Sequence, residues 1–198
     1  KTGSGTDILS MCGEDIGMRV ALIIGHDPAD EGAERITDGV QEYSWNLDLA
    51  ARIWKLDPEI FEIFHIDPSL SYSASIADVY DRVDAWGCDL TIEHHFNAAS
   101  SRATGTETFS SGSAGSLRCA HAIQAAMVET LGLRDRGVKI RNRSRKGRGY
   151  LSLVSGRAPA VLIEPYFGSN AGDCLRADER KQELAEAIYA AIRSVVDG

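Results

Sequence analysis

Short apolar runs alternate along this chain with longer segments of helical spacing. The runs have the length and composition of buried β-strands, and the longer segments repeat apolar residues every three or four positions. The predicted strands are residues 18–24, 60–66, 89–96, 106–109, 150–154 and 160–164. This alternation predicts an α/β fold: one domain with a central, mostly parallel or mixed, twisted sheet of about six strands flanked by helices.

The predicted helices lie between most of these strands. They are residues 42–56, a segment around 76–83, a segment around 117–131, and a last helix at about 178–196. Ser75 and Asp78 have the spacing of a capping box, which predicts that the second helix begins near Ser75. The last helix carries its apolar residues on one stripe opposite charged residues, as expected of a helix that packs on the sheet.

Length, composition and charge exclude several classes of protein. The 198 residues suffice for one sizeable core, and 43% hydrophobic with 25% charged residues is ordinary for a folded globular domain. The net charge of −8 argues against a protein that binds nucleic acid through its overall field. No run approaches the ~20 apolar residues of a membrane-spanning helix, so we do not expect a membrane as partner. We likewise expect no nucleic-acid partner, and we expect the chain to be a monomer.

The four cysteines indicate neither a zinc knuckle nor a small disulfide scaffold, because they lie far apart and lack Cys-x-x-Cys spacing. We expect mostly free thiols, with one disulfide as the alternative. The cysteines are Cys12, Cys88, Cys119 and Cys174.

Four polar residues follow or open beside strongly apolar runs and together are typical of a zinc hydrolase. His26 follows the first run, Glu42 opens the first predicted helix, His95 lies at the end of the third run, and Glu164 ends the last one. Two imidazoles and one carboxylate are a ligand set that zinc accepts in catalytic sites, where one position stays open for water. A further glutamate can take the proton of that water.

Each of these residues also has an ordinary structural explanation. A lone histidine at a strand end is more often a loop or capping residue, and a glutamate in the first turn of a helix is favoured by the helix dipole. Glu31 and Glu34 are alternative carboxylate ligands, and Asn46 lies one helical turn after Glu42 and could act with it. Glu164 is equally explained as a salt-bridged strand end.

The adjacent residues His94 and His95 are separated by strand alternation. Residues two apart share a face, so Glu93 and His95 lie on one side, while His94 lies on the other among apolar residues. This favours His95 as the ligand, with Glu93 as a hydrogen-bond acceptor that fixes its tautomer. His65 and His121 are predicted to have no role in the site.

Residues 141–148 contain five basic side chains in eight positions. A solvated loop is the default interpretation of such a cluster. Beside a cleft, however, guanidinium groups are well suited to hold substrate carboxylates.

Four segments resemble, in their order along the chain, the motifs of the zinc-dependent N-acetylmuramoyl-L-alanine amidases, a family of bacterial and phage cell-wall hydrolases. The segments are Ile-Ile-Gly-His26-Asp-Pro, Glu42-x-x-x-Asn46, His95-Phe-Asn97-Ala with Gly-Thr-Glu-Thr-Phe109, and Pro-Ala-Val-Leu-Ile-Glu164 with Phe-Gly-Ser-Asn170. The stretch Arg-Gly-Val-Lys139 also resembles a family element that precedes the last strand. The resemblance covers about residues 19–191 and implies His26, Glu42 and His95 as ligands of one Zn²⁺ per chain, with Glu164 as the catalytic glutamate.

Two positions depart from the family pattern without removing a ligand. Asp27 stands where the family usually has glycine after the first histidine, and Glu93 stands where it usually has serine two positions before the second. These departures affect the surroundings of the metal and therefore bear on substrate preference more than on the class of reaction.

The resemblance implies zinc-dependent hydrolysis of the amide bond between N-acetylmuramic acid and L-alanine in peptidoglycan, in the cell envelope, outside the cell, or by a phage lysin. Residues 1–17 are then expected to be an N-terminal linker or extension, and residues 18–198 the amidase catalytic domain. A polymeric substrate needs an open groove, predicted to be lined by Asn97, residues 110–116 and the basic stretch. Two alternatives stay open: a zinc carboxypeptidase-like peptidase, and a catalytically silent cell-wall-binding module.

Overall fold

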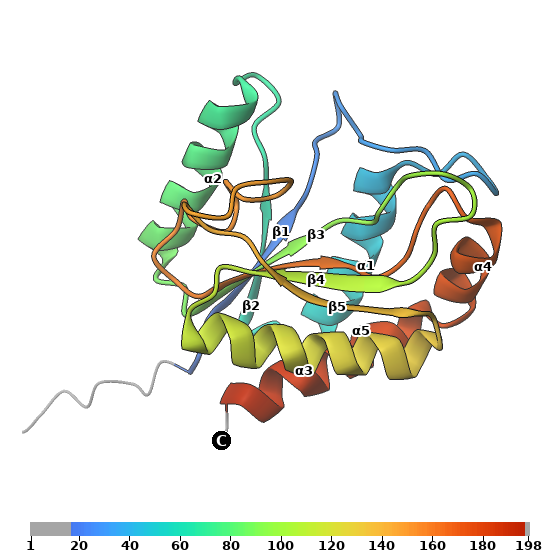
Figure 1. Cartoon of the computed structure of the whole chain (residues 1–198). Coiled ribbons are helices and arrows are strands. Elements are labelled where there is room, and N and C mark those ends of the chain that lie inside the picture. Colours follow the sequence, from blue (N-terminus) through green and yellow to red (C-terminus); the bar gives the residue numbers. More distant parts are fainter. Residues whose placement is uncertain (1–16, 197–198) are drawn as a thin grey trace, which may run out of the picture.

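A six-stranded mixed sheet forms the centre of the structure, a computed structural model in which residues 17–196 are described (Figure 1). The strands are β1 (Val20–Ile24), β2 (Phe61–His65), β3 (Leu90–His94), β4 (Thr106–Ser110), β5 (Asp135–Ile140) and β6 (Ala160–Glu164). Their order across the sheet is β2-β1-β3-β6-β4-β5. All neighbours are parallel except β4 and β6, which are antiparallel. The predicted α/β class and strand number are therefore confirmed.

Within residues 17–196, five helices flank this sheet on both faces. They are α1 (Glu42–Leu56), α2 (Tyr72–Trp86), α3 (Ala114–Leu131), α4 (Ala171–Glu179) and α5 (Lys181–Val196). Figure 1 shows α3 and α5 side by side on one side of the sheet and α2 on the other. The bounds predicted for α1 from sequence are confirmed.

The alternation of side chains along the strands divides the core into two layers. Leu22 and Ile24 of β1 pack with α1, α3 and α5, while Ala21 and Ile23 pack with α2. All four side chains are fully buried. Burying both faces of β1 explains why its sequence is continuously apolar rather than alternating.

One predicted strand was wrong, and another element takes its place in the sheet. Residues 150–154 form turns, and their leucines pack against the sheet instead of pairing with it. The sixth strand is β5, which pairs in parallel with β4 at the edge of the sheet. Its residues are partly exposed and polar and include Gly137, so β5 has no apolar run to mark it.

Two helix boundaries also differ from the prediction. The last helix begins at Lys181, and the separate helix α4 precedes it, with Asn170 as N-cap accepting a hydrogen bond from the Asp173 N–H. The predicted capping box is wrong because α2 begins at Tyr72, one turn earlier than expected. The Ser75 hydroxyl donates to the carbonyl oxygen of Tyr72 instead.

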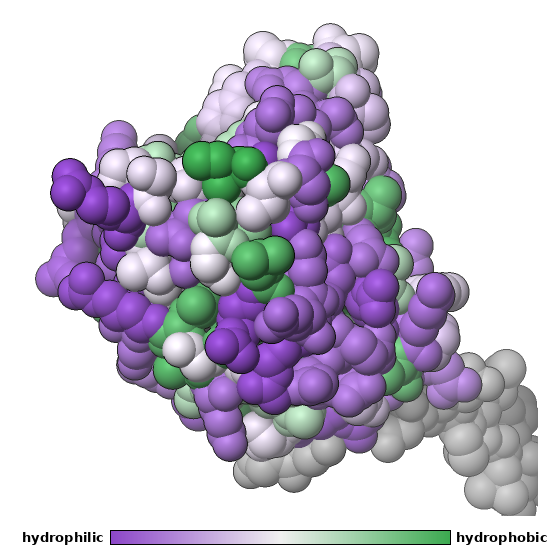
Figure 2. All heavy atoms as spheres, turned by 90° about the vertical axis from the view of Figure 1, so that its right-hand side faces the viewer, coloured by the Kyte–Doolittle hydropathy of each residue, from purple (hydrophilic) through white to green (hydrophobic). Residues whose placement is uncertain are grey.

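None of the helices in the described part of the chain has the length and apolarity needed to cross a bilayer. The face in Figure 2 is mainly hydrophilic, with hydrophobic residues in small separate groups. Cys88, Cys119 and Cys174 are free thiols, whereas Cys12 and nearly all of the predicted linker at residues 1–17 lie outside the described residues.

Candidate metal centre

The carboxyl ends of three adjacent strands bring the candidate residues together. β1 and β3 are parallel with Ile24 opposite His94, so the residues that follow each strand, His26 and His95, are neighbours. β3 and β6 are parallel with His94 opposite Ile163, which brings Glu164 beside His95. Ligand sites in open α/β sheets form at this edge, outside the carboxyl ends of parallel strands.

His26, Glu42 and His95 form a group that can hold a metal ion. One ligand atom from each residue lies within 4.8 Å of the others. His95 Nδ1 is 2.8 Å from Glu42 Oε1, and His26 Nε2 is 3.5 Å from Glu42 Oε2. Two imidazole nitrogens and one carboxylate oxygen fit the donor set of a catalytic zinc site.

The alternative carboxylates from the preceding loop are used elsewhere. Glu31 Oε1 accepts a hydrogen bond from the Ser44 hydroxyl, and Glu34 Oε2 accepts one from Gln41. Neither belongs to the group above. The structure therefore selects Glu42 over its neighbours as the carboxylate of the candidate centre.

His26 is held in an unusual backbone conformation. Its φ angle is +68°, in the left-handed region that non-glycine residues rarely adopt. Asp27 fixes the turn that follows, because its Oδ1 accepts hydrogen bonds from the N–H groups of Ala29 and Asp30 at 2.7 and 3.0 Å. Gly32 approaches the His26 ring so closely that a Cβ there would lie 2.6 Å from Cδ2. Strained backbone of this kind persists only where surrounding contacts hold it, and it concentrates at functional sites.

We expect Gly25→Ala to weaken metal binding by about tenfold or more, comparable to the loss of a group that orients a ligand. A Cβ at this position would lie 2.2 Å from Cε1 of His95, so the ring has to leave the position in which Nδ1 faces Glu42. The dissociation constant for zinc, measured by competition with a chelator, checks this expectation. Gly17→Ala is the matched control because a methyl group there meets nothing within 4 Å. Equal zinc affinity of the two variants would contradict the expectation.

Glu42 stays ionised in spite of its burial. The side chain is 1% exposed, and burial alone would raise its pKa. Its contacts with His26 and His95 outweigh that effect and hold the pKa well below the usual range. The Phe96 N–H also donates to Oε1 at 3.1 Å, so the carboxylate is fixed in position. The centre therefore offers a negatively charged oxygen to a cation.

Glu164 is a buried carboxyl at the end of β6, the strand that pairs with β3. Its side chain is 1% exposed, and among the described residues no group donates a hydrogen bond to its Oε2. Burial raises the pKa of this carboxyl to about 7, although the Arg148 guanidinium, 3.5 Å from Oε1, acts to lower it. A carboxyl whose pKa lies near neutrality can both accept and return a proton at physiological pH.

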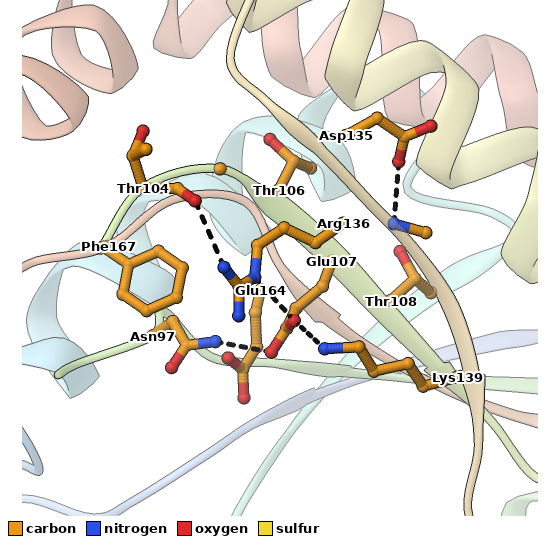
Figure 3. A network of polar contacts seen from close by, with 12 residues as sticks. Asn97, Thr104, Thr106, Glu107, Thr108, Asp135, Arg136, Lys139, Glu164 and Phe167 are labelled. Atoms are coloured by element: carbon orange, nitrogen blue, oxygen red, sulfur yellow. Dashed lines mark hydrogen bonds and ion pairs between the residues drawn. The ribbon is translucent and has the colours of Figure 1, made fainter. Parts of the chain in front are cut away.

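A second carboxylate, Glu107, lies directly opposite Glu164 in the β4–β6 register. Its Oε1 accepts a hydrogen bond from Asn97 Nδ2 at 2.6 Å, and its Oε2 contacts Arg136 Nε at 2.9 Å and Lys139 Nζ (Figure 3). Burial would raise the pKa of Glu107, but Lys139 and Arg136 outweigh it and lower that pKa. Two cations therefore neutralise the charge beside Glu164, a feature that the sequence analysis missed.

The structure places the other histidines outside the metal group. His94 faces away from the site, is fully buried and has a pKa lowered to about 3 by burial, so it is a neutral core residue. His65 Nδ1 lies 3.2 Å from the Tyr43 hydroxyl, outside the metal group. His121 lies on α3 and is likewise outside that group.

One cavity of about 640 Å³ joins the metal group to Glu164. Its polar lining residues include His26, Glu42, His95, Glu164 and Arg148. The larger apolar lining residues are Ile66, Pro68, Leu70, Tyr72, Ile76 and Leu162. Within the described part of the chain, Asn97 and residues 110–116 lie outside the lining, and Asn97 Oδ1 instead accepts a hydrogen bond from Arg148.

Comparison with known proteins identifies the family. A sequence profile of the N-acetylmuramoyl-L-alanine amidases (Amidase_3) matches residues 20–194. The chain belongs to this family. The chain is 31% identical over 185 residues to the N-acetylmuramoyl-L-alanine amidase LytC of Bacillus subtilis (strain 168), an alignment that covers 88% of the chain and 34% of LytC.

Two further relatives match over most of their own length. The chain is 31% identical over 191 residues to the uncharacterized protein YqiI of Bacillus subtilis (strain 168), covering 91% of the chain and 86% of YqiI. It superposes on the catalytic domain of CwlV, an N-acetylmuramoyl-L-alanine amidase of Bacillus (Paenibacillus) polymyxa, with a TM-score of 0.74 and 25% identity. That superposition covers 91% of the chain and 99% of the CwlV domain.

Proposed function

We propose that this chain is a zinc-dependent N-acetylmuramoyl-L-alanine amidase that hydrolyses the bond between N-acetylmuramic acid and L-alanine in peptidoglycan. One observation carries the proposal: a two-histidine, one-carboxylate group and a buried glutamate of raised pKa line the same cavity. Family membership and the printed names of LytC and CwlV support the same reaction. A catalytically silent module has no need of this combination.

In the proposed site, His26, Glu42 and His95 hold the zinc ion. Their donor atoms and mutual distances fit this ion, and the charge of Glu42 suits a cation. Bound there, zinc would supply Lewis-acid polarisation of the substrate carbonyl and would acidify a water molecule.

The chain's own residues then handle the proton. Glu164 accepts a proton from the attacking water at its carboxylate and delivers it to the amine of L-alanine as that group departs. Its Oε2, which has no hydrogen-bond partner among the described residues, is free for the first task. The neutralised Glu107 behind it limits the repulsion that a second bare carboxylate would add.

The cavity suggests how the substrate is bound. Arg148 is half exposed beside Glu164, and we assign it to a carboxylate of the stem peptide, because guanidinium groups bind carboxylates with two donors. Asn97 acts in this scheme by holding Arg148 and Glu107. The apolar lining residues of the cavity accommodate the less polar parts of the peptide or sugar.

We infer that the chain acts on the wall, in the cell envelope or outside the cell, as an autolysin or as a phage lysin. This placement follows from the polymeric substrate and from the cell-wall amidases among its relatives. The proposal assigns one Zn²⁺ and one active site to each chain, so a monomer suffices for activity.

Digestion of purified peptidoglycan tests this function. We expect new amino termini of L-alanine, no new reducing sugar ends, loss of the reaction with a chelator and recovery with zinc. Release of single carboxyl-terminal amino acids would identify the peptidase alternative. Absence of any product from protein that carries one zinc per chain would favour the wall-binding module.

A further inference from the structure

Glu93 is a buried carboxylate in direct contact with one of the candidate metal ligands. It is 2% exposed, and its Oε1 lies 2.9 Å from His95 Nε2. In the sheet it is paired with Ile23, so it faces the layer that contains α2. The other nitrogen of the same ring, Nδ1, faces Glu42. His95 is thus held between two carboxylates, one on each side of its ring.

Two further side chains hold Glu93 in place. The hydroxyl of Tyr80 on α2 donates to Oε2 at 3.1 Å, and the hydroxyl of Ser152 donates to Oε1 at 2.9 Å. Tyr80 and Ser152 are each 1% exposed. The turn at Gly156 packs against Tyr80, where a Cβ would lie 2.7 Å from Cδ1 of the ring. Burying a carboxylate without hydrogen-bond partners costs free energy, and these contacts reduce that cost. They also fix the position of the Glu93 carboxylate.

We propose that Glu93, held by Tyr80 and Ser152, is the positioning residue of the metal centre and fixes both the tautomer and the orientation of His95. Its carboxylate accepts the Nε2 proton, which leaves the Nδ1 lone pair on the side of Glu42, where His95 and Glu42 would hold the ion. A carboxylate acceptor on the far nitrogen also raises the basicity of the imidazole. The inference concerns the metal site of the proposed function and rests on that site, not on the identity of the substrate.

This arrangement is a property of this chain rather than of the family pattern alone. The resemblance described above places serine at this position, whereas Glu93 supplies a charged acceptor with a longer side chain. Charged acceptors form stronger hydrogen bonds than neutral ones. The contacts of Glu93 also connect the metal centre to α2 and to the 147–156 segment, so packing changes there reach His95 through Glu93.

Zinc affinity of the full chain is the first test, measured by chelator competition at a fixed pH. We expect Glu93→Gln and Glu93→Ser to bind zinc about 10- to 100-fold more weakly than the wild type. Tyr80→Phe should cause a smaller loss in the wild-type background and none in the Glu93→Ser background, because Tyr80 acts through Glu93. The matched control is Tyr43→Phe, which removes a hydroxyl placed against His65 instead.

The tautomer of His95 gives a second readout that a purely structural role does not change. In ¹⁵N NMR spectra of the zinc-loaded wild type we expect Nε2 of His95 to carry the proton, and in Glu93→Gln we expect exchange broadening or a shifted Nε2 signal. Wild-type zinc affinity in both Glu93 variants would overturn the proposal. So would an equal effect of Tyr80→Phe in the two backgrounds.

The two proposals can fail separately. A protein that binds zinc in a Glu93-dependent manner and does not cleave peptidoglycan would refute the proposed function and leave this inference intact. If the chain cleaves peptidoglycan as an amidase but its zinc affinity does not change when Glu93 is substituted, this inference is refuted and the proposed function stands.

Discussion

Glu164→Gln is expected to lower turnover by about 10²- to 10⁴-fold, the usual contribution of a general acid–base group. The amide preserves the shape of the buried side chain but neither accepts nor returns a proton at neutral pH. Zinc content should stay at one per chain, because His26, Glu42 and His95 are unchanged. Metal analysis, together with the rate at which L-alanine amino termini appear, checks both parts.

The wild-type pH profile adds to this test. Burial raises the pKa of Glu164 to about 7 in the metal-free protein, and a nearby bound cation lowers it from there. Turnover of the zinc-loaded protein should therefore fall as the pH drops from 7 through the lowered pKa of Glu164, since the protonated carboxyl no longer accepts a proton. The matched control for Glu164→Gln is Glu62→Gln, which changes an exposed glutamate on β2 and should leave turnover at the wild-type level. Undiminished turnover in zinc-loaded Glu164→Gln would remove Glu164 from the mechanism.

Glu42→Gln is expected to abolish activity by a different route, through loss of zinc. The substitution removes the negative oxygen from a buried group and leaves only two imidazoles and a neutral amide, a much poorer site for a divalent cation. The variant should carry no zinc at concentrations that saturate the wild type. Thermal unfolding in the presence and absence of zinc gives a second measure, since a ligand at 1,000 times its Kd stabilises by about 4 kcal/mol.

The structure supplies a matched control for this experiment. Glu31→Gln changes a carboxylate of the preceding loop that hydrogen-bonds to Ser44 and lies outside the metal group. It should retain zinc, the stabilisation and the activity. Loss of zinc in Glu31→Gln with retention in Glu42→Gln would reassign the carboxylate ligand.

The grouping of the site residues was predictable because it depends on local rules. Parallel strands place their carboxyl ends at one edge, so residues that follow apolar runs meet there. Strand alternation also separated His95 from the buried His94 without further information. These inferences need the strand positions but not the complete order of the sheet.

The supporting contacts were not predictable because they depend on which elements become neighbours. Arg136 and Lys139 reach Glu107 only because β5 pairs with β4, and β5 itself is a polar edge strand without an apolar run. The partners of Glu93, Tyr80 and Ser152, come from α2 and from a segment whose apolar residues suggested a strand. The spacing of apolar residues indicates that such a segment is buried. It does not indicate whether the segment hydrogen-bonds to a neighbouring strand or only packs its side chains on the sheet.

Two sets of residues that line the cavity come from different parts of the fold, and this has a consequence for how specificity can change. The candidate metal ligands and Glu164 come from strand ends and the start of α1, which the sheet holds in register, whereas most of the larger apolar lining residues come from the loop after β2 and the first turns of α2. Leu70 and Tyr72 of that loop region are 42% and 63% exposed and make few demands on the core. Exchanging residues 68–72 is therefore expected to change which substrate the proposed amidase site accepts, while the candidate metal ligands and Glu164 stay in place.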